Sequence, residues 1–141
     1  MVHALEEIRR VLAPDGILID IRPLADNWRV EVASLREVKR TGHVTDLPEQ
    51  TNGDEASNAA LDDVEKRGWF RREQSELFQF IYSWDMPSEM EEFINDDWND
   101  FIELDEDTQR ATRSAWAIAD ADSRVRVRVE ILIARWKKQN S

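Results

Sequence analysis

Two stretches of the sequence place charged or aromatic side chains where a strand is expected to end, and they are the first candidates for a binding site. Asp20, Arg22 and Trp28 surround the end of the apolar run ILIDIRP. In α/β proteins, ligands collect outside the carboxyl ends of strands. We therefore predict a ligand pocket from these three residues together with Tyr82 and Trp84, near the end of a second strand candidate. The alternative is that Asp20 and Arg22 pair with neighbouring side chains.

No further pattern indicates catalysis. The two histidines, His3 and His43, lie far apart in the chain, and the sequence contains no nucleophile-elbow, zinc-protease or P-loop motif. The chain has no Cys, which excludes disulfides and thiolate chemistry. The sequence therefore predicts no catalytic residue and no metal site.

Three groups of side chains have both a functional and a structural interpretation, and the structural one is favoured for each. A row of three alternating arginines near the C-terminus, here called the arginine row, could hold a phosphate or a carboxylate, but pairing with nearby acids is more common. The six Trp could form a binding surface, but large aromatic residues usually fill cores and interfaces. Five acidic residues in the segment expected to be helical, here called the acidic row, are typical of a solvated helix face rather than of a metal site. The arginines are Arg124, Arg126 and Arg128, and the acids are Glu89, Glu92, Asp96, Asp100 and Glu103.

The elements that must position these residues follow from the spacing of apolar side chains. Residues 4–12 repeat apolar side chains at helical spacing, and APDG ends this helix before the run ILIDI at 17–21. That run has little alternation, which favours a strand buried on both faces. Residues 28–46 predict one or two short strands, or a hairpin, in which Val30 and Val32 alternate with the polar residues Arg29 and Glu31. The polar segment 47–58 predicts a loop, and 58–68 a short helix.

The second half of the chain continues the alternation of strands and helices. Residues 69–86 are the longest strand candidate, and the end of this stretch is apolar on both faces, as in a strand inside a sheet. Residues 87–122 predict helix, broken at NDD so that Asp97 caps the next helix. Residues 124–138 alternate valine with arginine and predict a strand. The whole order predicts an α/β layer architecture.

Composition narrows the choice of partners. The chain has 141 residues and a formal net charge of −11. This sign argues against binding to nucleic acid or to an anionic membrane surface, because both require local positive potential. No apolar run is long enough to span a membrane, and no signal-peptide pattern is present. We therefore expect a cytoplasmic chain.

Three motifs in this order resemble the C-terminal half of a class I S-adenosylmethionine-dependent methyltransferase. ALEEIRRVLAPDGILIDIRP resembles the family's helix, Pro-Gly-Gly-type turn and fifth strand, with Asp15 where the family commonly has Gly. GWFRREQSELFQFIYSWDMPSEMEEFI is similar to the sixth strand and the helix that follows. VRVRVEILIARWKK is similar to the seventh, antiparallel strand. The resemblance implies one half-domain over residues 1–141, an incomplete Rossmann-like mixed sheet of about three main strands plus a small β insertion, flanked by helices.

The cofactor-binding motif of that family has no counterpart in this sequence. In the family, S-adenosylmethionine lies on a Gly-rich loop after the first strand, where glycines allow the backbone to approach the ligand. The four glycines of this chain are far apart, and none stands in a G-x-G context. No cofactor-binding residue can be assigned, and no cofactor is expected for the isolated chain. The sequence thus predicts a protein that is inactive as a methyltransferase on its own.

A half-domain of this kind has an exposed sheet edge. In the family the fifth strand lies between the fourth and the seventh, so without a fourth strand the run ILIDI has an unpaired edge. The exposed apolar patch would exceed what soluble monomers usually tolerate. We therefore expect a homodimer, or a separate complementary N-terminal half-domain.

Three functions remain open at this stage. The first is a methyltransferase-like module that persists by self-association. The second is the substrate-recognising half of a methyltransferase whose cofactor half is encoded separately. The third is a small-molecule binding or regulatory module that uses the aromatic residues near Trp28, Tyr82 and Trp84.

Overall fold

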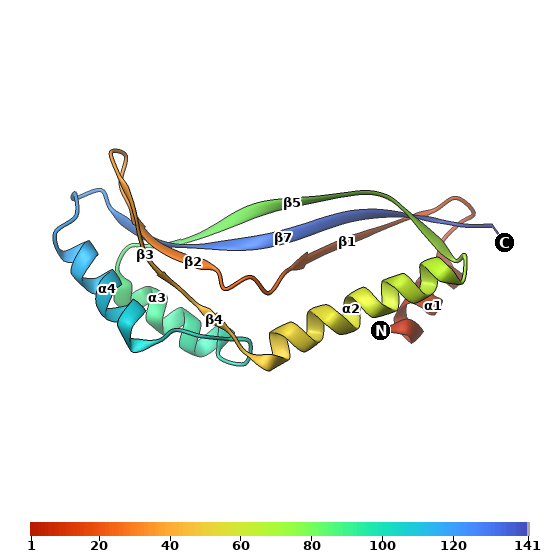
Figure 1. The fold of residues 1–141 in the computed structure, drawn as a ribbon. Coiled ribbons are helices and arrows are strands. Elements are labelled where there is room, and N and C mark those ends of the chain that lie inside the picture. The colour runs from red at the N-terminus through yellow and green to blue at the C-terminus, as the bar shows by residue number, and fades with distance from the viewer. Residues whose placement is uncertain (141) are drawn as a thin grey trace. The chain divides into compact units, whose positions relative to one another are not determined.

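The computed structural model describes residues 1–140, and it contains both helices and strands (Figure 1). The elements in chain order are α1 Val2–Val11, β1 Ile17–Pro23, β2 Arg29–Ala33, β3 Val38–His43, β4 Thr45–Asp46, α2 Pro48–Lys66, β5 Phe70–Trp84, α3 Pro87–Phe93, the π-helical turn Ile94–Trp98, β6 Ile102–Glu103, α4 Glu106–Ala117 and β7 Arg124–Lys138.

The main sheet has five strands, and β7 is the strand that joins the others. β1 and β2 both pair with β7, β3 pairs with β2, and β5 also pairs with β7. The β1–β7, β2–β7 and β2–β3 pairs are antiparallel. β5 also runs opposite to β7. The ion pairs Glu73–Arg135 and Asp85–Arg124 show this, because the residue numbers rise along β5 while those of the partners on β7 fall. The α/β composition is as predicted, but the sheet is antiparallel where a mixed sheet was expected.

The chain divides into two compact units, to which β5 and β7 both contribute. Unit 1 contains residues 1–24, 52–78 and 131–140, and unit 2 contains residues 25–51 and 79–130.

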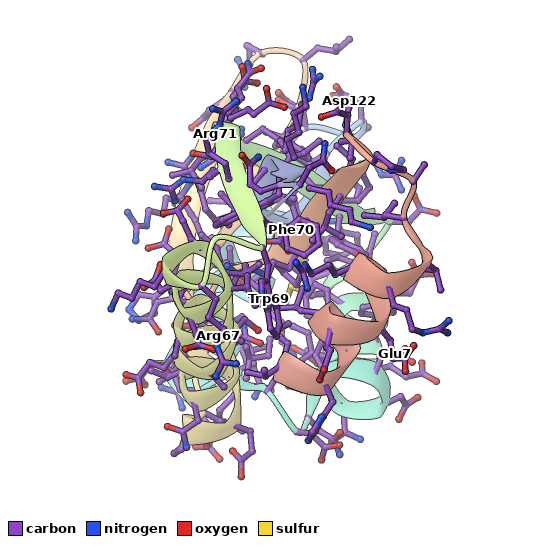
Figure 2. All side chains as sticks on the ribbon, turned by 90° about the vertical axis from the view of Figure 1, so that its right-hand side faces the viewer. Glu7, Arg67, Trp69, Phe70, Arg71 and Asp122 are labelled. Atoms are coloured by element: carbon purple, nitrogen blue, oxygen red, sulfur yellow. The ribbon has the colours of Figure 1, made fainter. Side chains whose placement is uncertain are left out.

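In unit 1, α1 and α2 pack on one face of the β1–β7 pair. Their shared core includes Leu5 of α1, Leu61 and Val64 of α2, and Trp136 of β7. Trp69 and Phe70 lie between the two helices in Figure 2. The guanidinium groups of Arg9 in α1 and of Arg67, the residue after α2, lie 5.2 Å and 5.1 Å from the centre of the Trp69 ring, and each makes a cation–π contact with it.

The turn between α1 and β1 depends on two residues with special backbone requirements. Asp15 has a φ of 62°, a left-handed conformation that side chains other than Gly, Asn and Asp rarely adopt. At Gly16 an added Cβ would lie 2.8 Å from the carbonyl oxygen of Ala13, so a larger residue would not fit. This tight turn reverses the chain directly from helix to strand, as the APDG motif predicted.

In unit 2, the β2–β3 hairpin packs against α4. The Thr41 and Thr112 hydroxyl oxygens lie 2.7 Å apart in a hydrogen bond, and Thr112 also donates to the carbonyl oxygen of Thr108. The alternating valines of β7 are fully buried on this side, as the period of two predicted. These valines are Val125, Val127 and Val129.

Two sequence predictions about local structure are wrong. The segment expected as a loop at 47–58 is helical, because α2 begins at Pro48 and runs to Lys66. Proline suits a first helical turn, and Gly53 has open space around it, which is compatible with a solvated helix face. The predicted cap Asp97 is exposed, and the cap of α4 is instead Asp105, which accepts a 2.7 Å hydrogen bond from the Thr108 backbone N–H.

Two strands are more exposed in this chain than their composition predicted. β1 was expected to be buried on both faces, but Ile17, Ile19 and Ile21 are 43%, 49% and 61% exposed. β5 was expected to resemble an inner strand, but most of its residues are exposed and its recorded partner is β7 alone. Both strands therefore lie at edges of the sheet within the described residues.

Candidate functional site

Asp20 and Arg22 lie next to each other on β1, on the face that α1 and α2 cover. The even positions of β1 face the helices, because Leu18 belongs to the packed core of unit 1 while the odd-numbered isoleucines are exposed. The Arg22 Nε donates to an Asp20 carboxylate oxygen at 3.1 Å, and the Arg22 Nη2 donates to the Asn58 side-chain oxygen at 2.7 Å. The Asp20 and Arg22 side chains are only 15% and 13% exposed.

These two residues line a pocket of about 290 Å³ between β1, α2, β5 and β7, here called the β1–α2 pocket. Its polar lining is Asp20, Arg22, Asn58, Asp62, Arg72 and Ser75, and its apolar lining is Leu61, Leu132, Ala134 and Trp136. Two acids and two arginines contribute formal charges that cancel. Asp20 and Arg22 thus line a concave surface that combines polar and apolar side chains, which is typical of small-molecule sites; here the apolar part of the lining is called the floor.

Two hydrogen-bond donors of this pocket have no acceptor among residues 1–140. The Arg22 Nη1 and the Trp136 Nε1 are both buried and both unpaired. Trp136 as a whole is 3% exposed, and its ring is 5.8 Å from the Arg72 guanidinium. A buried donor without a partner costs about 1–3 kcal/mol of stability, and a native structure normally matches such groups.

Trp28, Tyr82 and Trp84 belong to a cluster of aromatic rings in unit 2. The Trp98 ring joins them, with centroid distances of 5.2 Å to Trp28, 4.9 Å to Tyr82 and 6.3 Å to Trp84. Phe93 packs 5.0 Å from Trp98. Most of these pairs meet edge to face or at a tilt, a geometry that stabilises aromatic contacts. Trp98 lies at the end of the π-helical turn Ile94–Trp98.

The rings of the aromatic cluster pack against one another. Trp28 is 5% exposed, and the Tyr82 and Trp84 rings stack with their centroids 6.1 Å apart. The structural interpretation of these tryptophans is therefore the one that the ring contacts support. The predicted site combines these three residues with Asp20 and Arg22; Trp28, Tyr82 and Trp84 belong to unit 2, and Asp20 and Arg22 belong to unit 1.

A second charged arrangement, here called the Glu31 cluster, consists of Arg29, Glu31, Arg126 and Arg128 in unit 2. Glu31 is 0% exposed, and one of its oxygens accepts hydrogen bonds of 2.9 Å from Arg126 Nε and from Arg128 Nε. The other oxygen lies 3.3 Å from Arg29 Nε, close enough for charge attraction although not aligned for a hydrogen bond. The predicted pairing of the arginine row with acids is confirmed, and Arg124 pairs with Asp85.

The remaining candidates have simpler roles. All five residues of the acidic row are exposed, but they do not share one helix face, because only Glu89 and Glu92 lie in α3 and Glu103 lies in β6. Residues 1–140 contain no group of three or more metal-binding side chains close enough to share an ion. A wider pocket of about 620 Å³ next to Gln109 contains none of the buried unpaired polar atoms found in the described chain, and Gln109 itself donates to the Leu104 carbonyl at 2.9 Å.

Sequence reasoning missed three residues that matter to these sites. Trp136 and Asn58 complete the β1–α2 pocket, and Glu31 organises the three arginines. A signal for Trp136 was present in the sequence, because the alternation of valine with charged residues ends at Ile131 and the strand becomes apolar on both faces from there. Asn58 carried no signal, because its helix was taken for a loop. Glu31 was placed on the polar face of β2, and nothing local indicated that this face is covered.

Comparison of the chain with protein-family models, with curated proteins and with solved structures gives no match. In the part of the chain that the structure describes, no helix has both the length and the apolar character needed to cross a membrane.

Proposed function

We propose that this chain is a methyltransferase-like half-domain that has no methyl-transfer activity of its own and that associates with a second copy of itself. The observation that carries the proposal is the antiparallel pairing of β1 with β7, from Ile17 opposite Lys137 to Pro23 opposite Ile131. β1 resembles the fifth strand of the family and β7 resembles its seventh, so this pairing is what the resemblance implies.

The turn before β1 gives independent support. Asp15 stands where the family commonly has Gly, and its φ of 62° is the left-handed conformation that favours Gly. A conformation that favours Gly at this position is compatible with the resemblance, although the residue differs. The Gly-rich cofactor loop has no counterpart in the sequence, which is why we propose a protein without transfer activity on its own.

The outer border of β1 favours self-association. β7 is the only strand that pairs with β1 within residues 1–140, so the opposite backbone edge is unpaired. Ile17, Ile19 and Ile21 form an exposed apolar row on one face of this edge strand. Edge strands of this kind readily pair with a second chain.

The sequence of β1 is compatible with pairing to itself. An antiparallel pair centred on Ile19 would place Ile17 of one copy opposite Ile21 of the other, and Ile19 opposite Ile19. All isoleucines would then share one face, where apolar cross-strand pairs stabilise a sheet. Asp20 and Arg22 give the strand no net charge, so the overall charge of −11 is not concentrated at this border.

The molar mass in solution tests the proposal. We expect a dimer at micromolar concentration by light scattering or sedimentation, and we expect Ile19→Lys to shift the mass to that of a monomer, because a buried lysine opposite its own copy is unfavourable. Leu35→Lys is the matched control, since Leu35 is fully exposed and lies outside β1. Circular dichroism reports whether each variant remains folded.

Two results would contradict the proposal. One is a folded wild-type monomer at micromolar concentration. The other is saturable binding of S-adenosylmethionine to the isolated chain in a calorimetric titration. A dimer that Leu35→Lys disrupts as strongly as Ile19→Lys would reject the β1 border while leaving self-association in place.

A second candidate function is the substrate-recognising half of a methyltransferase completed by a separate cofactor-binding chain. The β1–α2 pocket favours it, because Asp20 and Arg22, which line the pocket, belong to the strand that resembles the family's fifth. Under this function the wild-type chain is a monomer alone, and methyl transfer appears only when the complementary half is added.

A further inference from the structure

We propose that the β1–α2 pocket binds a small molecule that carries one carboxylate group on an apolar body. This inference does not depend on the resemblance to methyltransferases or on self-association. It depends on the polar atoms of the pocket, on its charge and on its apolar floor.

The unpaired atoms of the pocket are both donors. The Arg22 Nη1 and the Trp136 Nε1 are buried without an acceptor in the described chain, and both residues line the pocket. Neither group can accept a hydrogen bond, so no rearrangement of these two side chains would let them satisfy each other. Each group therefore needs an acceptor that the described residues do not supply, and a ligand in the pocket is one source of it.

The surroundings of Arg22 hold its guanidinium in place. Its Nε is bound to Asp20 and its Nη2 to Asn58, which leaves Nη1 as the nitrogen without a partner. A guanidinium that is fixed in this way loses little rotational freedom when it binds a ligand, which favours recognition. Charge-assisted hydrogen bonds from guanidinium to carboxylate are among the strongest in proteins.

The charge of the lining favours a single negative charge over two. Arg22 and Arg72 contribute positive charge, but Asp20 and Asp62 line the same pocket. Any anion here meets the same two acids and two arginines, but a phosphate dianion carries two charges and is repelled by the acids more strongly than a carboxylate, which carries one. The floor formed by Leu61, Leu132, Ala134 and Trp136 supplies apolar surface for the rest of the molecule.

The test uses the full chain with ¹⁵N-labelled tryptophan, which gives six indole N–H signals in an NMR spectrum. Benzoate, acetate and inorganic phosphate are titrated separately at constant ionic strength. We expect benzoate to shift the Trp136 signal saturably and to bind about tenfold more tightly than acetate, because the ring buries apolar surface on the floor. Phosphate should bind more weakly than benzoate.

Variants identify the groups involved. Arg22→Gln removes the guanidinium and should weaken benzoate binding by about tenfold or more. Asp62 is exposed, so Asp62→Asn should fold normally and should tighten binding by removing a like charge. Arg36→Gln is the matched control, because Arg36 pairs with Asp120 in unit 2 and lines no part of this pocket.

The outcomes separate this inference from the proposed function. An absence of any saturable shift of the Trp136 signal in the folded wild-type chain would overturn it, and so would equal effects of Arg22→Gln and Arg36→Gln. Phosphate binding more tightly than benzoate would also reject the proposed ligand class. None of these results depends on the molar mass, which tests the self-association of β1.

Discussion

The Glu31 cluster and the β1–α2 pocket both place arginines and acids on the sheet, but their polar atoms are matched differently. In the Glu31 cluster the buried atoms without a hydrogen bond are a donor and an acceptor of opposite charge, Arg29 Nε and a Glu31 oxygen 3.3 Å apart, which attract each other although they are not aligned for a hydrogen bond. In the β1–α2 pocket both atoms without a hydrogen bond are donors, on Arg22 and Trp136. The first pair therefore keeps a partner of opposite charge, whereas the two donors of the pocket cannot bond to each other and need an acceptor from elsewhere.

This difference separates a structural use of buried charge from a binding use. The carboxylate of Glu31 is completely buried and is surrounded by three arginines, so it neutralises part of the positive charge that lies on β2 and β7. Buried ion pairs of this kind are strongly destabilising when one partner is removed. The predicted effects below therefore decrease from the cluster to the pocket and then to an exposed carboxylate.

The largest effect is expected for Glu31→Gln. The change leaves three guanidinium groups around a neutral amide, and the loss of a partner from a buried ion pair typically costs about 3–5 kcal/mol. Urea unfolding of the full chain measures the difference. Glu37→Gln is the matched control, because Glu37 is exposed. A loss no greater than that of the control would show that the cluster is not a structural centre.

A smaller effect is expected for Arg126→Gln. Arg128 still donates to the same oxygen of Glu31, so the carboxylate keeps a partner, and we expect a loss of about 1–3 kcal/mol. Arg124→Gln should cost less than about 1 kcal/mol, because its partner Asp85 is 76% exposed. If both substitutions had the same effect in urea unfolding, the difference between buried and exposed pairs would not hold here.

Arg22→Gln should change the stability of the ligand-free chain by less than about 1 kcal/mol. The substitution removes the contact with Asp20 but also removes a buried donor that has no acceptor, and these two terms oppose each other. The same urea measurement applies. A loss of unfolding free energy as large as that of Glu31→Gln would mean that Arg22 stabilises the ligand-free fold as strongly as Glu31 does.

The smallest effect concerns the exposed cap Asp105, and it should depend on pH. The hydrogen bonds from the backbone N–H and the side chain of Thr108 lower the pKa of Asp105 below its ordinary value of 3.8. The unfolded chain therefore binds the proton more readily, so the contribution of Asp105 is present above pH 3.8 and is lost as the pH falls through the folded-state pKa.

Thermal unfolding across this range compares Asp105→Ala with Asp105→Asn. The alanine variant should be less stable than the wild type near neutral pH and should converge with it in acid. Asparagine also caps helices but does not titrate, so its deficit relative to the wild type should shrink over the same acid range. A deficit of the alanine variant that is constant with pH would contradict the role of the charge.

Local patterns predicted most elements but not the surfaces that cover them. The alternation of Val125, Val127 and Val129 located β7 and its buried side, and the helix, turn and strand at the N-terminus were also predicted. Glu31 was correctly placed on the polar side of β2. Its burial depends on Arg126, 95 positions away in the chain, and no local pattern carries that information.

The candidate site was predicted in part for the same reason. Asp20 and Arg22 do line a pocket, since the end of a strand is a general location for ligands. Its other wall is α2, whose first half is polar and contains Gly53, so local propensity favoured a loop. The helix is stabilised by the packing of Leu61 and Val64 further along, a tertiary effect that propensity does not describe.

The ring cluster around Trp98 has a spectroscopic consequence. Because Trp28 and Tyr82 lie 5.2 Å and 4.9 Å from Trp98, their electronic transitions should couple and give a split circular-dichroism signal in the ultraviolet. Trp69 and Trp136 belong to unit 1 and lie outside this cluster. The chain therefore carries an intrinsic optical probe that follows the melting of unit 2 separately from that of unit 1.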